Sequence, residues 1–325
     1  MNFHQKIHGS GRHDPAGGKG TGPAHPTGTE AVWILQRFRS RSEALANPNT
    51  ARLVDALAAR GLAARIVNPD RVDQALGPDA LRIGGQTVAQ PLALIGRSGS
   101  NTGARARALS AAFEQRGTVA LPSARALALA GDKRVAGQLL SAAGLPVPDF
   151  EEIGPGVDAH AIGQRLGWPL LLKAARGSKG RSVQLVRGPG ELAMAVAGLL
   201  DQGPLIAQRF LSESKGRDIR VMVVGGTAIG AMERTARDTD AFLANIASGG
   251  VGRSVPLSSG IATLAEAAAR VAELEIAGVD LLHAGAGFAV CELNTAPGFV
   301  AFEAVTGIDV AGAIAALVAA RLARW

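Results

Sequence analysis

The chain has 325 residues, of which 47% are hydrophobic and 19% charged, a composition that excludes a chain disordered throughout. At about 100–200 residues per domain, this length allows two or three domains. The single cysteine, Cys291, excludes an internal disulfide framework and a cysteine-based metal cluster and fits a reducing compartment, and the absence of Tyr excludes that residue as an acid or nucleophile.

Positive charge is concentrated in the first part of the chain. The formal net charge is +7, but residues 1–133 carry 17 Lys and Arg against 9 Asp and Glu, whereas residues 134–325 carry 17 against 18. A basic region favours an anionic partner, either a nucleic acid or an acidic small molecule or peptide. Because the second part is nearly neutral, we do not expect nucleic acid to be the main partner.

The first 28 residues are predicted to be a disordered arm. Met1–Gly28 is polar, rich in Gly and Pro, and lacks the apolar segment of a secretory signal. The apolar stretch Val310–Ala320 is shorter than the ~20 residues that span a bilayer. We therefore expect a cytoplasmic protein with no membrane partner.

The region 29–128 is predicted to form a small parallel α/β domain. Strands are expected at 31–35, 62–67 and 91–95, helices at 47–59 and 104–115, and a hairpin at 82–88. Such domains bind ligands at the carboxyl ends of their strands. The glycine- and serine-rich loop 96–103 follows such an end, so it is either an anion-binding loop or an ordinary connection.

The remainder of the chain mixes helices, strands and hairpins. Helices are expected at 133–143, 191–200, 264–274 and 309–321, a turn at 127–130, a polar loop at 245–252, and strands at 169–174, 182–186, 205–211, 218–224, 227–233, 277–282 and 288–293. Asp132 is placed to cap the helix that begins at Lys133. We expect a domain boundary just before this helix.

Two carboxylates are expected to meet on the last two strands. Asp280 lies in an apolar strand, and Glu292 and Asn294 lie two residues apart in the next one. By strand alternation, Glu292 and Asn294 point to the same side, while Cys291 and Leu293 face the core. Carboxylate and amide oxygens suit Mg²⁺. The alternative is that the two carboxylates only form ion pairs with nearby Arg, since a carboxylate in an apolar strand needs a compensating partner.

Two lysines are candidates for binding phosphate. Lys133 begins a helix, and Lys173 lies in an apolar strand shortly before the glycine-rich segment 177–180. A buried Lys needs an anionic partner, and glycines let backbone N–H groups approach a phosphate closely. The order of the lysines, the glycine loop and the acidic set predicts a nucleotide site.

The order and sequence of these motifs resemble the ATP-grasp superfamily and, more closely, the RimK-type α-L-glutamate ligases. The similarity covers residues 30–322, and its most specific segments are Gly278-Val279-Asp280 and Glu292-Leu293-Asn294-Thr295-Ala296-Pro297-Gly298. The other matching segments are 130–133, 144–148, 172–174, 177–180, 208–211, 216–221, 233–234, 242–250 and 306–309.

The resemblance implies a three-domain ATP-grasp fold of mixed α/β and α+β character that traps ATP between two α+β subdomains. After the leader at 1–28, it implies an N-terminal domain at 29–128, a central lid subdomain at 129–205 and a C-terminal subdomain with the metal site at 206–325. The implied enzyme is an ATP-dependent carboxylate–amine ligase. It phosphorylates a carboxylate and joins the resulting acyl phosphate to an amine, in this family usually that of glutamate.

The resemblance also implies roles for individual residues. Arg234, Lys173 and Asn245 would be catalytic, and Arg234 would neutralise charge on the acyl phosphate. Asp280, Glu292 and Asn294 would hold two Mg²⁺, which Mn²⁺ could replace. The residues that would bind ATP are Lys133, Lys173, Gly177, Ser178, Gly180 and Asn245 at the phosphates, Gln208, Arg209 and Phe210 at the adenine, and Asp218 near the ribose.

Two positions depart from the family pattern. The adenine hinge commonly carries Glu where this chain has Arg209, and family members tend to carry Arg where this chain has Leu243. Arg237 and Arg253 are candidates to supply the missing guanidinium. The departure at Leu243 keeps open a ligase for a different amino acid or amine.

The charge distribution predicts an anionic acceptor. Arg37, Arg39, Arg41 and Arg97 follow strand ends in the domain that helps to receive the acceptor in the resembling family, and guanidinium groups pair well with carboxylates. We expect a glutamate-rich peptide tail or a glutamyl cofactor. The alternatives are a solvated basic face and a non-catalytic nucleotide- or nucleic-acid-binding module. The oligomeric state stays open, with a homo-oligomer as one option.

Overall fold

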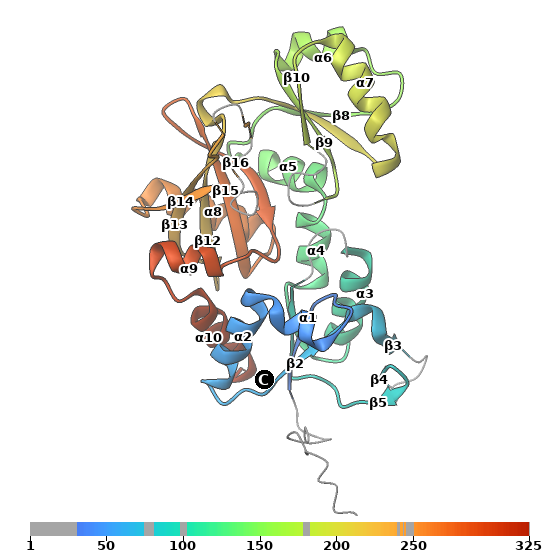
Figure 1. The fold of residues 1–325 in the computed structure, drawn as a ribbon, viewed down its shortest axis with the longest axis vertical. Helices are drawn as coiled ribbons and strands as arrows, with labels where there is room; N and C mark the ends of the chain where they lie inside the picture. The colour runs from blue at the N-terminus through green and yellow to red at the C-terminus, as the bar shows by residue number, and fades with distance from the viewer. Residues whose placement is uncertain are drawn as a thin grey trace, which may run out of the picture.

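The described chain forms three units, each built on one main sheet, and a small fourth sheet belongs to the first unit. The structure, a computed structural model, describes residues 31–74, 81–97, 103–177, 183–238, 241–242, 244 and 250–324. Figure 1 shows the central unit at the top, the C-terminal sheet at the left and the N-terminal unit below them.

The N-terminal unit contains a four-stranded parallel sheet. Its strand order is β2 (Ala64–Val67), β1 (Val32–Leu35), β6 (Ala93–Gly96), β7 (Val119–Leu121). The helices are α1 (Arg41–Ala46), α2 (Pro48–Ala58) and α3 (Gly103–Glu114), and a small antiparallel sheet contains β3 (Val72–Gln74), β4 (Leu81–Ile83) and β5 (Gln86–Thr87). All four residues of β1 are buried, as expected for a parallel strand covered on both faces. The expected α/β domain is confirmed.

Two short helices connect this unit to the central one (Figure 1). Helix α4 (Ala124–Ala130) includes the segment 127–130 that was expected to be a turn, and that expectation was wrong. Ser123 caps α4 by accepting a hydrogen bond from the Ala126 N–H. Helix α5 (Lys133–Ala142) is capped by Asp132, as expected.

The central unit is a four-stranded antiparallel sheet covered by two helices. Its order is β10 (Val183–Val186), β9 (Leu170–Ala174), β11 (Leu205–Arg209), β8 (Phe150–Ile153), and its helices are α6 (Ala159–Leu166) and α7 (Pro189–Leu199). Leu172 and Ala207 pack in the core beneath the helices. Alternation along the strands therefore points Lys173 and Gln208 to the opposite face.

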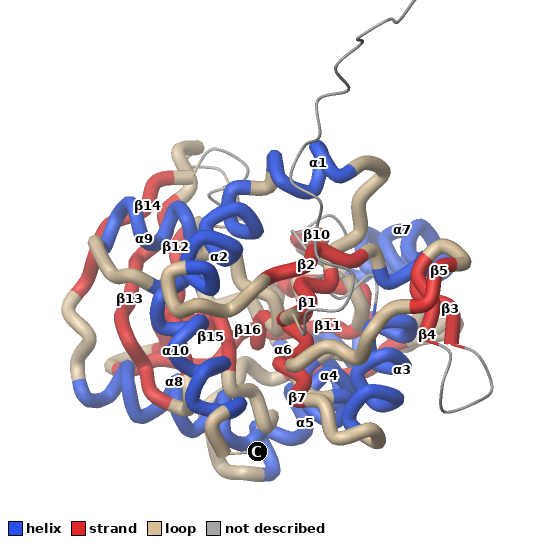
Figure 2. The backbone as a smooth tube through the Cα atoms, turned by 90° about the horizontal axis from the view of Figure 1, so that it is seen from below, coloured by secondary structure: helices blue, strands red, loops and turns tan. Residues whose placement is uncertain are grey.

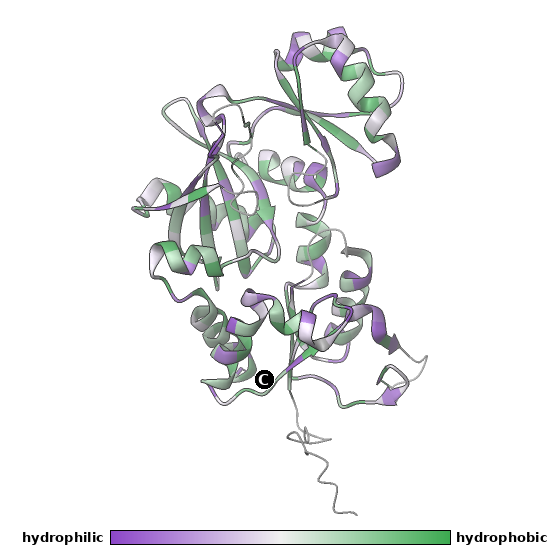
Figure 3. Cartoon of the chain, in the orientation of Figure 1, coloured by the Kyte–Doolittle hydropathy of each residue, from purple (hydrophilic) through white to green (hydrophobic). Residues whose placement is uncertain are grey.

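The C-terminal unit is a five-stranded antiparallel sheet. Its order is β14 (Val251–Val255), β13 (Thr227–Thr235), β12 (Arg217–Val224), β15 (Ile276–Ala284), β16 (Gly287–Asn294), and its helices are α8 (Ser259–Val271), α9 (Val300–Thr306) and α10 (Val310–Leu322). Val221 and Val279 pack against α8, while Met222 belongs to a second core with α9 and α10. The strands are mainly hydrophobic, with hydrophilic bands across them (Figure 3).

One hydrophobic core joins the N-terminal unit to the last helix of the C-terminal unit. Leu53 and Leu57 of α2 lie in the same buried cluster as Val310 and Ile314 of α10. Figure 2 shows α2 beside α10. Within the described residues, no single helix is long and apolar enough to cross a membrane, although α9 and α10 together, bent by 116°, pass that test by length and composition.

The domain limits expected at 128 and 205 stay predictions. Strand β11 pairs with β9 and β8, so the central sheet extends four residues beyond the predicted limit at 205. The end of the expected polar loop 245–252 is a strand, because β14 begins at Val251. Residues 245–249 of this loop lie outside the described residues.

Candidate active site

The predicted metal ligands lie on one face of the C-terminal sheet. Asp280 of β15 is paired in register with Glu292 of β16 on one side and with Arg220 of β12 on the other. Their strand neighbours Val221, Val279 and Leu293 pack toward α8. The charged side chains therefore occupy the opposite face, which confirms the predicted meeting of the two carboxylates.

Asp280 lies at the centre of a buried charge network, whose members are Asp218, Arg220, Arg234 and Asp280. Arg220 donates two hydrogen bonds to Asp280, one of them from Nη2 to Oδ2 at 2.7 Å, and Arg234 Nη2 lies 3.0 Å from the same oxygen. Arg234 also donates to both oxygens of Asp218, at 2.6 and 2.7 Å. Two cations and two anions thus balance each other in a site shielded from water.

The pKa values of the two aspartates in this network are shifted in opposite directions. Burial raises the pKa of Asp280, but the charges and hydrogen bonds of Arg220 and Arg234 outweigh it and bring the pKa to about 2. Burial and the negative charge of Asp280 raise the pKa of Asp218 to about 6, against the opposing effect of Arg234. Asp280 is therefore the permanent anion of the network.

The residues present fit a magnesium ion. Asn294 Nδ2 donates to Asp280 Oδ2 and to the Gly278 carbonyl, both at 3.1 Å, which leaves the Asn294 amide oxygen for a cation. Glu292 presents a carboxylate that is 35% exposed. Two carboxylates and an amide oxygen form a hard donor set. The described ranges contain no group of three His, Cys, Asp or Glu that could hold a metal ion.

A β-bulge brings Cys291 next to the phosphate-binding candidates. Asp280 is paired with Glu292 but Leu281 with Val290, so Cys291 is the extra residue on β16. Its Sγ lies 3.8 Å from Lys173 Nζ, and Lys173 is buried and also donates to Gln208 Oε1. The predicted core orientation of Cys291 was wrong, because the bulge interrupts the alternation from which it was derived.

Lys133 connects the central glycine segment to the acidic strand. Its Nζ donates to the Gly177 carbonyl at 3.0 Å and lies 3.3 Å from Glu292 Oε1. Gly177 has a φ of +147°, a conformation that favours glycine. Lys133, Lys173 and Glu292 therefore converge from α5, β9 and β16, which the sequence places far apart.

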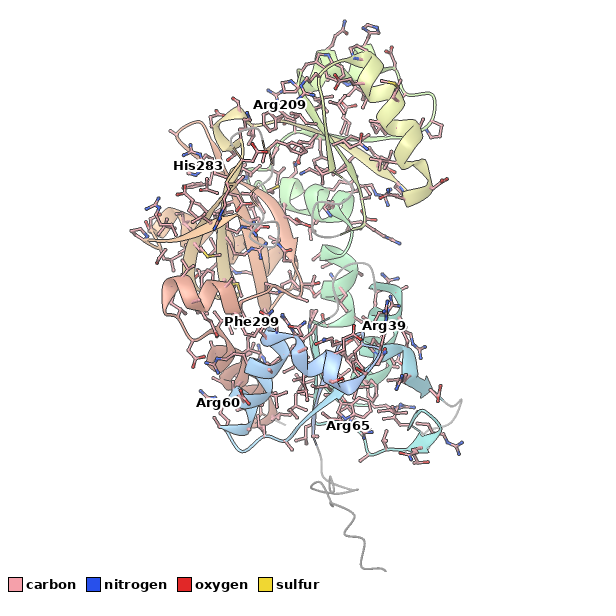
Figure 4. All side chains as sticks on the ribbon, viewed as in Figure 1. Arg39, Arg60, Arg65, Arg209, His283 and Phe299 are labelled. Carbon is pink, nitrogen blue, oxygen red and sulfur yellow. The ribbon has the colours of Figure 1, made fainter. Side chains whose placement is uncertain are left out.

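The predicted adenine hinge begins on β11, with Gln208 and Arg209 as the last two residues of that strand. Arg209 is exposed, and its Nη2 lies 3.0 Å from Asp149 Oδ2. Its backbone N–H donates to the Asp149 carbonyl at 2.8 Å. Figure 4 shows Arg209 where the chain leaves the central unit for the C-terminal sheet, and Phe210 follows it, partly buried.

Some predicted site residues lie outside the described residues. They are Ser178, Gly180, Leu243 and Asn245. Of the two candidates to replace the guanidinium expected at 243, Arg253 pairs with Glu233 at 2.7 Å and Arg237 is exposed.

Sequence reasoning missed Arg220, which makes the closest contacts to Asp280. The signal was available, because Arg220 lies two residues after Asp218 and so shares its face of the strand. A second missed group surrounds Asp132, which accepts from Arg134 at 2.9 Å and from Arg176 at 3.2 Å. This group holds the start of α5, and with it Lys133, against the end of β9.

The fold agrees with comparisons to known proteins. The family model of the RimK-like ATP-grasp domain matches residues 130–318. A probable alpha-L-glutamate ligase of Enterobacter sp. is 34% identical over 269 residues, covering 80% of this chain and 88% of that protein. A RimK domain ATP-grasp protein of Sphaerobacter thermophilus has a TM-score of 0.68 at 24% identity, covering 88% of this chain and 98% of that one.

Another relative shares only part of its length. Beta-citrylglutamate synthase B of zebrafish is 36% identical over 195 residues, which cover 58% of this chain and 48% of that protein. The chain thus spans about half of that relative and most of the bacterial ligase. The predicted fold and family are confirmed: the chain belongs to the RimK-like ATP-grasp family and is an ATP-grasp ligase that forms carbon–nitrogen bonds with ATP and Mg²⁺.

Proposed function

We propose that this enzyme joins the amine of L-glutamate to a carboxylate of an acidic acceptor. The observation that carries the proposal is the convergence of Lys133, Lys173 and Glu292 beside the Asp280 network. Cations for phosphates and oxygen donors for magnesium lie together there, as ATP-driven activation of a carboxylate requires. The names of the relatives, a glutamate ligase and a citrylglutamate synthase, support glutamate as the amine.

The roles of the residues follow from the family resemblance, and Ser178, Gly180 and Asn245 lie outside the described residues. Lys133 and Lys173 would bind the ATP phosphates, together with Gly177, Ser178, Gly180 and Asn245, and Gln208, Arg209 and Phe210 would contact the adenine. Asp218 would lie near the ribose. Asp280, Glu292 and Asn294 would hold two Mg²⁺ or Mn²⁺, which when bound offset the charge of the transferring phosphoryl group.

Arg234 is the candidate for stabilising the acyl phosphate. Its guanidinium bridges Asp218 and Asp280 and is thereby held in one orientation. A fixed cation stabilises developing negative charge without reorganising during the reaction. Since the enzyme needs no covalent intermediate with a side chain, positioning and charge supply its share of catalysis.

The departure at Leu243 favours a second candidate, the same reaction with a different amine. The decisive experiment measures ADP release by the full chain with ATP and Mg²⁺ across the twenty amino acids. The acceptors are citrate, N-acetyl-L-aspartate and glutamate-rich peptides, and mass spectrometry identifies each product. We expect the mass of one or more glutamyl residues on an acidic acceptor. A different added amine establishes the second candidate, and ADP release without any amide product contradicts both.

A further inference from the structure

Arg97 stands at the carboxyl edge of the N-terminal parallel sheet. It directly follows β6, and its backbone N–H donates to the Leu35 carbonyl at the end of β1 at 2.8 Å. This hydrogen bond fixes the backbone of Arg97 at the edge of the sheet. The carboxyl edge of a parallel sheet is where α/β units bind their ligands.

The guanidinium of Arg97 is held in place without an anion. Its Cζ lies 5.2 Å from the ring centroid of Phe299, which is fully buried. The Nε atom is buried and finds no hydrogen-bond partner in the described part of the chain, and burial lowers the pKa of the group to about 10. A buried donor without a partner is unfavourable, so pairing the guanidinium with an incoming carboxylate is favoured. The residue as a whole remains partly exposed, so a ligand can reach it.

The aromatic partner of Arg97 belongs to the segment that follows the metal site. Phe299 comes five residues after Asn294, and Figure 4 shows it where the C-terminal sheet meets the N-terminal unit. Between them, Pro297 packs on Gly278: a Cβ built on this glycine would lie 2.8 Å from Pro297 Cβ and 3.1 Å from Arg220 Cδ. Arg97 is thus connected through one short segment to the network around Asp280.

The charges of the site distinguish Arg97 from the other cations. Lys133 and Lys173 lie beside Glu292 and Gln208, and the Asp280 network pairs both of its arginines. No acidic side chain among the described residues lies within ion-pair distance of Arg97. Arg37, by contrast, pairs with Asp70 at 2.7 Å. Of the arginines expected to receive the acceptor, Arg97 therefore combines a buried donor that no described residue satisfies with a contact to the ring of Phe299, in the segment that follows the metal-site strand.

We propose that Arg97 binds a second carboxylate of the acceptor, distinct from the carboxylate that is phosphorylated. The acceptor would then be a dicarboxylate or a longer polycarboxylate, held with its reacting end toward the metal site and another carboxylate against the N-terminal unit. A carboxylate matches the fork of a guanidinium group, and the ring of Phe299 presets the plane of that fork. This assignment rests on the proposed function. Because the cations of the central unit already serve the phosphates, we assign Arg97 to the acceptor rather than to ATP.

The test compares two peptides that differ by one carboxylate. N-acetyl-Glu-Glu and N-acetyl-Glu-Gln are titrated by calorimetry into the full chain saturated with ADP and Mg²⁺, with the wild type and with Arg97→Gln. We expect the wild type to bind the first peptide at least about tenfold more tightly. Arg97→Gln should abolish this preference and change the Kd of ADP less than about twofold. An undiminished preference in the variant, an absent preference in the wild type, or a weakened ADP affinity would each overturn the proposal.

Two further variants control for structural effects. Arg65→Gln removes an exposed arginine 5.9 Å from the ring of Trp33 on the same sheet and should change neither peptide affinity. If Arg97→Gln does not fold, as judged by thermal unfolding, Arg97→Lys keeps the charge but loses the fork, and it should retain only part of the preference. Because binding is measured without turnover, a failure to incorporate glutamate would contradict the proposed function and leave the result for Arg97 standing.

Discussion

Arg220 and Asp280 face each other in register on β12 and β15 and form a two-hydrogen-bond ion pair at the predicted metal site. Asp280 is 7% exposed and Arg220 12%. A carboxylate so buried is tolerated because two guanidinium groups surround it. Both oxygens of Asp280 accept from Arg220, and Oδ2 also lies beside Arg234 and Asn294, so a cation bound here would displace one of these partners.

Removal of Arg220 should destabilise the protein. Arg220→Met leaves Asp280 with Arg234 as its only cationic partner in the network, so we expect a loss of about 2–4 kcal/mol in the free energy of unfolding. Urea denaturation in magnesium-free buffer measures this loss. Arg253→Met, which breaks an ion pair whose arginine is 70% exposed, serves as the control and should cost less than about 1 kcal/mol. Equal losses in the two variants would contradict the central role of Arg220.

The raised pKa of Asp218 predicts a specific pH dependence of stability. The native state holds this proton up to about pH 6, whereas the unfolded chain releases it near pH 4. The stability contributed by protonated Asp218 is therefore fully present below about pH 4 and lost as the pH rises through 6. The pKa of Asp280 is lowered to about 2, so the stability that its ionised form contributes is lost only as the pH falls toward 2.

Asp218→Asn cannot undergo this loss. Between pH 4.5 and 7, its free energy of unfolding should improve relative to the wild type by on the order of 2 kcal/mol. Urea unfolding at both pH values with EDTA present measures the change. Asp149→Asn, which removes a carboxylate that is 64% exposed, is the surface control with which the change is compared. A constant difference between Asp218→Asn and the wild type would mean that Asp218 titrates normally.

Lys173 should contribute strongly to nucleotide affinity. Lys173→Met removes a charged donor from the buried face of β9, so we expect the Kd of ADP with Mg²⁺ to rise about 10- to 100-fold by calorimetry. Arg187→Met, at a side chain that is 70% exposed in the central unit, should leave the Kd unchanged. Wild-type affinity in Lys173→Met would remove this lysine from the phosphate site.

Glu292 should control the requirement for magnesium. In Glu292→Gln the donor set loses one of its two carboxylates, so half-maximal ADP release should need at least about tenfold more Mg²⁺. The partly exposed side chain predicts little change in the melting temperature. Glu273→Gln, on an exposed ion pair with Arg125, is the matched control. An unaltered Mg²⁺ titration in Glu292→Gln would argue that Glu292 only pairs with Lys133.

Asn49 should anchor the segment that carries Phe299. Its Oδ1 accepts hydrogen bonds from the Phe299 and Val300 N–H groups at 2.6 and 3.1 Å. Asn49→Ala leaves both donors unsatisfied and should lower the free energy of unfolding by about 1–3 kcal/mol, measured in urea. Asn49→Asp retains the acceptor and should recover most of this loss. If both substitutions cost the same, the hydrogen bonds do not account for the effect.

The sequence by itself determined the family and most of the elements of the fold. Continuous apolar runs such as Val32–Leu35 form strands that are buried on both faces, and the cap at Asp132 begins a helix as its short polar side chain predicts. The two-residue period of a strand was sufficient to place Glu292 and Asn294 on one face. These features are local, so they can be read from neighbouring residues.

Tertiary structure alone decided the partners of the charged residues. Arg220 and Asp280 are 60 positions apart, and only the register of β12 on β15 pairs them. The bulge at Cys291 turned a side chain expected in the core toward Lys173, because the extra residue results from how β16 pairs with β15. Likewise, Arg97 was one basic residue among several until the packing of Phe299 buried its Nε atom. Charge and periodicity are carried by the chain, but burial and pairing depend on residues that only the folded chain brings together.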